Sequence, residues 1–332
     1  MHILTETLDD ALGALYSSLL LQQDVIKGTR DPFREVVGVQ IEITHPRARL
    51  SRTETRGKPF SALGELLWYL TRDNRLDFIR PYIPRYVKES ADGLTVRGGY
   101  GPRLFSQRGH DQVANVIELL RAHPATKRAV IQIFDAEDTA GDHVEVPCTT
   151  SFQFLVRKEL LHMIVTMRSN DAFMGLPHDV FCFTMLQEIV ARSLDRDIGS
   201  YRQFTGSMHL YERHRDAAQE YLTEGLQART EMPSMPLEDP WPALKTMLTA
   251  KARIAAGENL DAGVEMRNSY WADLVRLLQI FHASGDEPRI ATLKGAMTDR
   301  RYFAYIDSRR AMKPRRKRIR VSDQSETAGN GR

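Results

Sequence analysis

Residues 147–179 of this chain contain a possible nucleophile and a possible anion-binding group. Pro147 and Cys148 open the stretch, and Arg168 stands near its end. A cysteine thiolate is a strong nucleophile, and a nearby guanidinium favours the thiolate over the thiol. Arginine also binds phosphate and carboxylate groups through paired N–H donors. These residue types predict covalent chemistry on an anionic substrate.

Two apolar segments must bring Cys148 and Arg168 together. Residues 151–156 and 160–167 are apolar and partly β-branched, and a polar turn at 157–159 separates them. This pattern predicts an antiparallel hairpin. Cys148 then begins the first strand and Arg168 ends the second, so the two residues meet at one edge of a sheet.

Motifs in this order and spacing resemble those of the thymidylate synthase family. After Pro-Cys come Phe-Gln-Phe at 152–154, Arg-Ser-x-Asp-x-Phe-x-Gly-Leu-Pro at 168–177 and Gly-Ser-Met-His-Leu-Tyr at 206–211. The resemblance covers about residues 55–215. Its upstream part consists of Gly-Glu-Leu-Leu-Trp-Tyr-Leu at 64–70, Tyr-Gly at 100–101 and Lys-Arg at 127–128 before an apolar strand.

The resemblance implies an α+β fold, with a large twisted sheet packed by helices, and a back-to-back homodimer. In the family the thiolate that matches Cys148 adds to C6 of a pyrimidine nucleotide. C5 then becomes a carbon nucleophile and takes a one-carbon unit from 5,10-methylenetetrahydrofolate. A lone cysteine is more often structural, so the catalytic assignment of Cys148 depends on the flanking motifs.

Three basic residues match the family's phosphate-binding group: Arg168, Lys127 and Arg128. In the family the paired basic residues reach across from the other subunit. For Lys127 and Arg128 a solvated turn is the alternative interpretation. A further arginine from the N-terminal third, Arg30 or Arg34, is expected to join the group.

Other motif residues match sugar and folate contacts. His209 and Tyr211 correspond to the pair that hydrogen-bonds the sugar 3′-hydroxyl, although isolated residues of these types are often polar groups of the core. The resemblance places Ser169 near the phosphate. It places Asp171 near the pterin of the folate, and Gly175 of the same motif is assigned to the cofactor site.

Two residues are candidates for proton transfer. Glu65 lies in an apolar segment that predicts a helix over 60–70, and burial raises the pKa of a carboxyl group, which suits general acid–base catalysis. In the family the matching acid organises water and shuttles protons. Tyr100 matches a tyrosine that helps proton removal at C5, with a buried structural tyrosine as the alternative.

Asp179 bears on which base is recognised. Synthases have Asn here, whose amide accepts from uracil N3–H and donates to O4. Cytosine presents the reverse pattern, and a carboxyl group can accept from its amino group and share a proton with N3. Aspartate at this position resembles the cytidylate hydroxymethylases. An N-cap role for a helix beginning at residue 180 is also compatible.

Three departures from the synthase pattern favour water as the final reactant. No tryptophan stands around Ile83 and Pro84, where synthases place one near the one-carbon unit; Thr149 replaces a histidine, and Met167 replaces a glutamine. We therefore expect 5-hydroxymethylation of CMP or dCMP. The alternatives are a methyl-forming enzyme on dUMP or UMP, and a non-catalytic nucleotide- or RNA-binding protein. The sugar and the pathway stay open.

Composition excludes several other classes. The 332 residues are 42% hydrophobic with a net charge of +3, which is ordinary for a globular protein and too weak to indicate a nucleic-acid partner. No run approaches the roughly 20 apolar residues of a membrane helix, and the N-terminus lacks a signal-peptide pattern, so a cytoplasmic protein is expected.

The two cysteines are Cys148 and Cys182. They lack the spacing of zinc ligands, so no metal is expected. Cys182 is predicted to be a core residue.

The organisation follows from periodicity and from prolines. A single catalytic domain is expected over 1–312, with a divergent helical part from about 230, and 313–332, opening with a basic block at 313–320, is expected to be a disordered tail. Residues 71–110 are rich in loops. Helices are predicted over 5–22, 60–70, 110–121, 180–194, 209–222, 243–256 and 270–284, and strands over 36–43 and 129–134, the latter buried.

Overall fold

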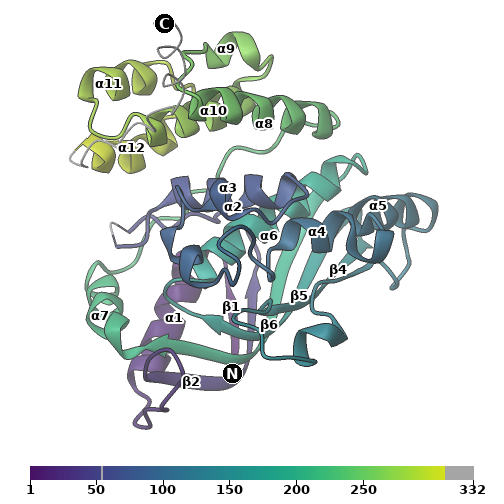
Figure 1. Ribbon diagram of the computed structural model, residues 1–332, viewed down its shortest axis with the longest axis vertical. Helices are drawn as coiled ribbons and strands as arrows, with labels where there is room; N and C mark the ends of the chain where they lie inside the picture. The colour runs from purple at the N-terminus through teal and green to yellow at the C-terminus, as the bar shows by residue number, and fades with distance from the viewer. Residues whose placement is uncertain (54, 311–332) are drawn as a thin grey trace, which may run out of the picture.

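The computed structural model describes residues 1–53 and 55–310, which form an α+β fold around a six-stranded sheet (Figure 1). The strands are β1 (His2–Thr5), β2 (Phe33–Ile43), β3 (Val130–Gln132), β4 (Thr149–Arg157), β5 (Leu160–Asp171) and β6 (Asp197–Tyr211). Their order is β1-β2-β6-β5-β4-β3. The pairs β1–β2 and β5–β6 are parallel, and the other neighbours are antiparallel.

Helices cover one side of this sheet and extend above it (Figure 1). The α-helices are α1 (Leu8–Leu20), α2 (Pro59–Leu70), α3 (Leu76–Ile79), α4 (Tyr100–Phe105), α5 (Gln112–Ala122), α6 (Leu176–Arg192), α7 (Arg215–Thr223), α8 (Trp241–Ala255), α9 (Ala262–Glu265), α10 (Ser269–His282), α11 (Glu287–Gly295) and α12 (Phe303–Arg310). The 3-10 helices are η1 (Pro84–Lys88), η2 (Gln107–Gly109), η3 (Ala136–Thr139), η4 (Glu212–His214) and η5 (Arg300–Tyr302).

Local sequence signals set the helix starts. Thr7 and Asp10 form a capping box before α1, in which the Thr7 side chain accepts from the Asp10 N–H and the Asp10 carboxylate accepts from the Thr7 N–H. Pro59 and Pro177 lie in the first turns of α2 and α6, where a missing N–H costs nothing. The helices predicted over 5–22, 60–70, 110–121 and 180–194 are confirmed as α1, α2, α5 and α6, although α6 begins earlier than predicted, at Leu176.

The two faces of the sheet differ. Ile41, Phe152 and Val165 lie on the face that packs against α1 and α6, and each is almost fully buried. The opposite face carries apolar side chains in contact with solvent, including Phe204 at 41% and Val130 at 43% exposure. A partly apolar sheet face without a helical cover is a candidate surface for association.

The hairpin prediction is confirmed, and two element predictions are wrong. β4 and β5 pair antiparallel, with Phe152 opposite Val165. The strand predicted over 129–134 is shorter and lies at the sheet edge, so it is only half-buried. The helix predicted over 209–222 starts later. Residues 209–211 end β6, where β2 pairs with all three and β5 pairs with His209, so they are held extended; α7 begins at Arg215.

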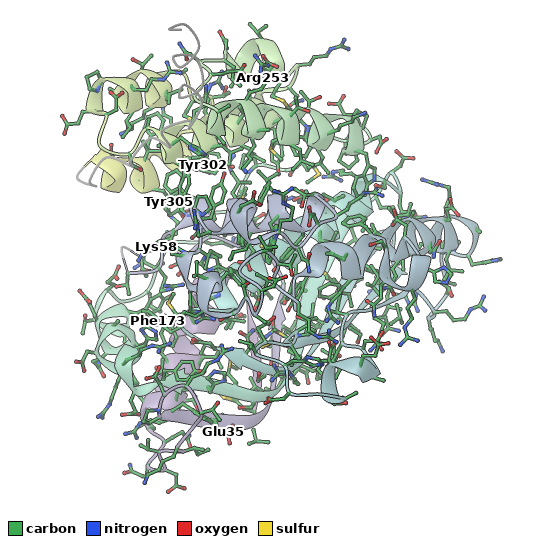
Figure 2. The ribbon with its side chains drawn as sticks, in the orientation of Figure 1. Glu35, Lys58, Phe173, Arg253, Tyr302 and Tyr305 are labelled. Carbon is green, nitrogen blue, oxygen red and sulfur yellow. The ribbon has the colours of Figure 1, made fainter. Side chains whose placement is uncertain are left out.

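The helical layer α8–α12 lies above α2 and α3 (Figure 1). The predictions over 243–256 and 270–284 are confirmed as α8 and α10. Phe281 of α10 stacks on Tyr82 with ring centroids 4.4 Å apart. Tyr305 lies at the lower boundary of the layer (Figure 2), and its hydroxyl accepts from Arg52 at 3.2 Å. The layer thus packs on segments next to the cavity described below. The basic block 313–320 lies outside the described residues.

A buried ionic cluster ties this layer's connecting segment to the sheet domain. Glu188 of α6 is fully buried and accepts from Arg47 Nε at 2.7 Å, from the Met235 N–H at 3.0 Å and from the Arg49 guanidinium. Burial raises the pKa of Glu188, but Arg49 and Arg47 outweigh it, and the net pKa lies below its ordinary value. The carboxylate is therefore ionised and fixed at neutral pH.

Replacing Glu188 with glutamine is expected to lower the free energy of unfolding by about 3–5 kcal/mol, because the buried Arg49 loses its counter-charge and the partly buried Arg47 keeps only Asp197. Urea unfolding at pH 7 measures this loss. Glu159→Gln is the control, since its side chain is 85% exposed and its pair with Arg196 contributes little. Because the folded-state pKa of Glu188 is depressed, its contribution is complete above its unfolded pKa and disappears as pH falls through the folded value. Equal losses in the two variants would contradict the expectation.

Candidate active site

A cavity of about 1400 Å³ lies between α2, η1, β5, α6, β6 and α7. Most of the site residues predicted from the sequence line it: Cys148, Glu65, Asp179, Tyr100, Arg168, Ser169, His209, Tyr211, Asp171 and Gly175. Lys127 and Arg128 do not line it; both are exposed in the turn before β3. The fold therefore brings ten of the predicted residues together and leaves the basic pair apart.

Cys148 lies directly before β4, beside the end of β5. The Arg168 N–H donates to the Cys148 carbonyl at 2.8 Å, and the Ser169 hydroxyl donates to Cys148 Sγ at 3.6 Å. Burial raises the pKa of the thiol, although Arg168 and Ser169 act to lower it. Arg168 lowers the pKa of the thiol as expected, but burial raises it by more. The expectation of a favoured thiolate is therefore wrong for the free protein.

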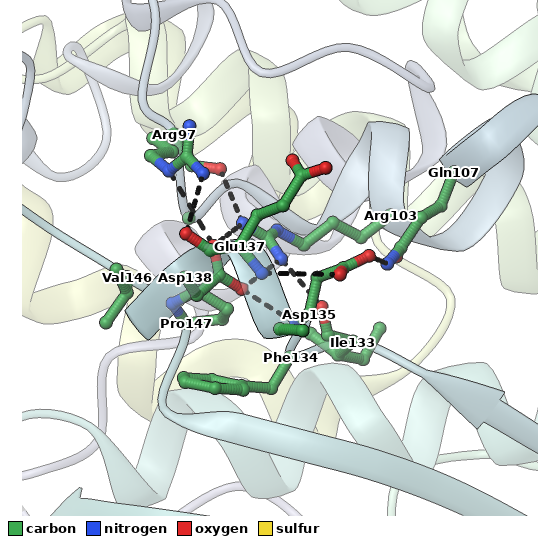
Figure 3. A network of polar contacts seen from close by, with 12 residues as sticks. Arg97, Arg103, Gln107, Ile133, Phe134, Asp135, Glu137, Asp138, Val146 and Pro147 are labelled. Carbon is green, nitrogen blue, oxygen red and sulfur yellow. Dashed lines mark hydrogen bonds and ion pairs between the residues drawn. The ribbon is translucent and has the colours of Figure 1, made fainter. Parts of the chain in front are cut away.

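Arg168 also holds the loop that carries Cys148. Its Nε and Nη2 donate to the carbonyls of Pro147 and Val146, both at 3.1 Å. The preceding acidic loop is anchored too: Arg103 donates to both carboxylate oxygens of Asp138, and Arg97 approaches the same group (Figure 3). These contacts limit the freedom of the backbone that positions the thiol.

Glu65 lies in the middle of α2 and faces the cavity. The Tyr86 hydroxyl, from η1, donates to Glu65 Oε1 at 2.7 Å. Burial raises the pKa of Glu65 to about 7, against the lowering effect of hydrogen bonds from Tyr86 and Tyr69. The raised pKa expected from the sequence is confirmed, and a group that titrates near neutrality can both accept and donate protons.

Asp179 lies in the first turn of α6, and the N-cap of that helix is Gly175. The N-cap role considered for Asp179 is therefore wrong, because the helix begins at Leu176 and not at residue 180. Burial, followed by the charge of Glu65, raises the pKa of Asp179 well above its usual range. The neutral acid is the favoured form in the free protein.

Tyr100 is held beside Cys148 by its neighbour Thr149. Its hydroxyl donates to Thr149 Oγ1 at 2.9 Å and accepts from the Thr149 N–H at 3.3 Å. Burial raises the pKa of Tyr100 well above its usual value, so the phenol keeps its proton. Thr149, which follows Cys148 where synthases have histidine, thus fixes the tyrosine hydroxyl.

The sugar and phosphate candidates lie at the end of β6 and in the loop before β2. His209 and Tyr211 pack edge to face, with ring centroids 5.0 Å apart, and burial lowers the pKa of His209. Their positions on a strand give them a common side, as the i, i+2 spacing indicates. Arg30 lines the cavity and pairs with Glu89 at 3.3 Å, whereas Arg34 pairs with Glu212 outside it. Arg30 is the better candidate for the further arginine.

Polar groups at the α7 end of the cavity fit a folate. Asp171 Oδ1 accepts from the Phe173 and Met174 N–H groups, while its buried Oδ2 has no partner among the described residues. Arg56 stacks over Phe173 at 4.7 Å, and its buried Nε and Nη2 also lack partners there. A free acceptor beside free cationic donors matches a ligand with pterin N–H groups and an anionic end.

Sequence reasoning missed Tyr86, Glu89 and Arg56. Tyr86 stands three residues beyond Ile83, close to where a tryptophan was expected, so that comparison could have pointed to it. Arg56 and Glu89 carry no local signal, since charged residues in loops are usually solvated. Their burial depends on the packing of distant segments.

Comparison with known proteins places the chain in a family. The family model described as thymidylate synthase matches residues 27–250, and the chain belongs to this family. It is 30% identical over 181 residues to the thymidylate synthase of Francisella philomiragia, which covers 49% of this chain and 65% of the relative. It is 33% identical over 162 residues to the deoxyuridylate hydroxymethyltransferase of Pseudomonas phage M6, covering 48% and 46%.

A further relative supports the same grouping. The deoxyuridylate hydroxymethyltransferase of Bacillus phage SP01 is 29% identical over 211 residues, covering 59% of this chain and 55% of the relative. The chain therefore spans between about half and two thirds of the length of these relatives. Across residues 1–53 and 55–310, no cluster of three metal-ligating side chains occurs, and no helix has the length and apolar character needed to cross a bilayer.

Proposed function

We propose that this protein transfers a hydroxymethyl group to C5 of a cytosine nucleoside monophosphate, with 5,10-methylenetetrahydrofolate and water as co-reactants. The observation that carries this proposal is that the Asp179 carboxyl group lies in the same cavity as Cys148, at the position of the family's base-reading asparagine. A neutral carboxylic acid offers one O–H donor and one carbonyl acceptor. These match the N3 acceptor and the amino donor of cytosine.

The arrangement supports a covalent route. Cys148 attacks C6, and Asp179 gives its proton to N3 as negative charge develops on the ring. C5 becomes nucleophilic and takes the one-carbon unit that the folate supplies. The Tyr100 hydroxyl, which bonds Thr149 next to Cys148, assists removal of the C5 proton. Loss of this proton breaks the bond to the folate nitrogen, so that tetrahydrofolate leaves and an exocyclic methylene remains on C5. Water then adds to the exocyclic methylene, Cys148 leaves C6, and the hydroxymethyl product is released.

A uracil nucleotide is the second candidate. Two relatives are named deoxyuridylate hydroxymethyltransferases. A neutral Asp179 can also accept from uracil N3–H and donate to O4 when its other oxygen carries the proton. A uracil substrate requires Asp179 to be protonated, and the raised pKa of this carboxyl group meets that requirement. Both candidates share the nucleophile and the one-carbon chemistry, so the base must be decided by assay.

The test incubates the purified protein with methylenetetrahydrofolate and C5-deuterated CMP, dCMP, UMP or dUMP, and identifies products by mass. Loss of deuterium with a hydroxymethyl product from a cytosine nucleotide supports the proposal and also identifies the sugar. A hydroxymethyl or methyl product from a uracil nucleotide alone would replace it with an alternative. No exchange with any of the four would favour a non-catalytic nucleotide-binding protein.

We also propose a back-to-back homodimer within a single domain that includes the helical layer. The open sheet face, with Phe204 and Val130 exposed, offers an apolar surface for a second copy. Lys127 lies at the edge of that face, where its carbonyl accepts from Gln153 at 2.9 Å. Because Lys127 and Arg128 do not line their own cavity, contact with the phosphate requires the second subunit.

Mixing two inactive variants tests the shared site. Cys148→Ala and the double variant Lys127→Ala/Arg128→Ala are each expected to be inactive, and their equimolar mixture should recover roughly a quarter of wild-type activity, since half of randomly formed dimers are mixed and each has one complete site. The control mixes Cys148→Ala with Glu65→Gln. Each of these variants damages the cavity of its own subunit, so a mixed dimer has no complete site and no activity should return. If the first mixture stays inactive after subunit exchange, the shared-site proposal fails.

A further inference from the structure

Tyr86 is a cavity residue that the chemistry described so far leaves without a role. It belongs to η1, a short element inside the loop-rich segment 71–110, and lines the cavity in direct contact with α2. Its ring lies 5.2 Å from the ring of Trp68, and its hydroxyl donates to Glu65 Oε1 at 2.7 Å. Burial raises the pKa of Tyr86 well above its ordinary value. The hydroxyl therefore remains a donor at every physiological pH.

This contact joins the proton-transfer candidate to the segment in which the synthase tryptophan is missing. A fixed donor on one carboxylate oxygen limits the rotation of Glu65 and stabilises its ionised form. The remaining lone pairs of the carboxylate then stay available to a water molecule. Trp68 and Tyr69 also line the cavity, and neither side chain acts as a base toward water.

We infer that Tyr86 is a positioning residue that holds Glu65 as the proton acceptor for the water attacking the exocyclic methylene carbon. This inference rests on the proposed hydroxymethylation. In the step, the water oxygen forms a bond to the methylene carbon, and a water proton moves to Glu65. The electron pair passes through C5, the C6–Sγ bond breaks, and Cys148 leaves as the thiolate. Tyr86 keeps its own proton throughout.

Other groups that face Glu65 also shift its pKa, and the Tyr86→Phe variant leaves these groups unchanged. Tyr69 of α2 lowers its pKa by hydrogen bonding, Arg85 of η1 lowers it, and Glu89 raises it. Asp179 and Cys182, both of α6, are coupled to the Glu65 charge from the other side. Tyr86→Phe removes one oxygen atom and leaves this surrounding set intact.

The experiment compares wild type, Tyr86→Phe, Glu65→Gln and the double variant in full-length protein, with steady-state product formation and C5 exchange followed from pH 5 to 9. Tyr86→Phe should lower kcat by about 10-fold, the effect of one hydrogen bond to a charged group, with KM for the nucleotide nearly unchanged. Loss of the donor raises the pKa of Glu65, so the acid limb of the profile should move up by about one pH unit.

The matched control is Tyr221→Phe. The Tyr221 hydroxyl donates to the Asp9 carboxylate at 2.7 Å, the same kind of contact in a residue that does not line the cavity. This variant should keep the wild-type kcat and pH profile. The double variant Tyr86→Phe/Glu65→Gln should be no slower than Glu65→Gln alone, because the two residues act as one unit.

Two outcomes would overturn the inference. The first is that Tyr86→Phe keeps the wild-type kcat and the wild-type acid limb of the pH profile. The second is that Tyr86→Phe lowers kcat by the same factor when Glu65 has already been replaced by glutamine. Failure of the proposed function looks different, since the wild type itself then gives no hydroxymethyl product. In that case no water attack exists for Tyr86 to serve, and the inference falls with it.

Discussion

Replacing Cys148 with alanine is expected to abolish C5 exchange and product formation, with a loss of about 10⁴-fold or more. Without Sγ, no bond to C6 forms and C5 never becomes a carbon nucleophile. Deuterium release from the C5-labelled nucleotide measures the effect directly. Cys148 is only half-buried and its backbone contact with Arg168 remains in the variant, so the fold should be retained.

Cys182→Ala is the matched control for that experiment. Cys182 is fully buried in α6, where its thiol contacts the Ala62 carbonyl at 3.5 Å, and it does not line the cavity. Its removal should cost a little stability and leave exchange intact. Substantial turnover in Cys148→Ala would rule out the covalent route and with it the proposed function.

The second large effect concerns the base. Asp179→Asn is nearly isosteric and restores the residue that uracil-specific members of the family carry. We expect the ratio of kcat/KM for cytosine over uracil nucleotides to fall by about 10²–10³-fold, because two hydrogen-bonding positions become mismatched to cytosine. Competition between CMP and UMP, or dCMP and dUMP, measures this ratio in one reaction.

Asp171→Asn provides the comparison for the base experiment. Asp171 also lines the cavity but lies towards the proposed folate end, with Oδ1 accepting from the Phe173 and Met174 N–H groups. This variant should weaken folate binding and leave the preference between the bases unchanged. If Asp179→Asn keeps the wild-type preference, Asp179 does not read the base.

Several elements could be predicted because their signals are local. The apolar periodicity of α1 and α8 determines which side each helix buries, whereas α2, α6 and α10 are buried on nearly all sides. Capping residues or prolines mark the starts of these helices. The hairpin also followed from two apolar runs. Its exact turn did not: Lys158 and Glu159 both take positive φ, at 51° and 63°, a conformation that side chains of this type seldom adopt.

The errors in prediction have a common cause. His209 and Tyr211 lie at the start of a segment with helical character, yet they belong to β6, because β2 pairs with both residues and β5 also pairs with His209. The strand at 130–132 is at an edge, and its sequence cannot show how many neighbours it has. Pairing partners are distant in the chain, so local patterns carry no information on them.

The sequence by itself determined the family and most of the residues that line the cavity, because these occur as motifs with fixed order and spacing. The same motifs predict Cys148 as the nucleophile and Asp179 as the residue that reads the base. Only the tertiary structure decided their chemical state. Burial raises the pKa values of Cys148, Glu65 and Asp179, and it does so through side chains contributed by distant elements. The Tyr86–Glu65 contact likewise depends on packing between η1 and α2. Desolvation and long-range contacts are properties of the folded chain, which no local pattern contains.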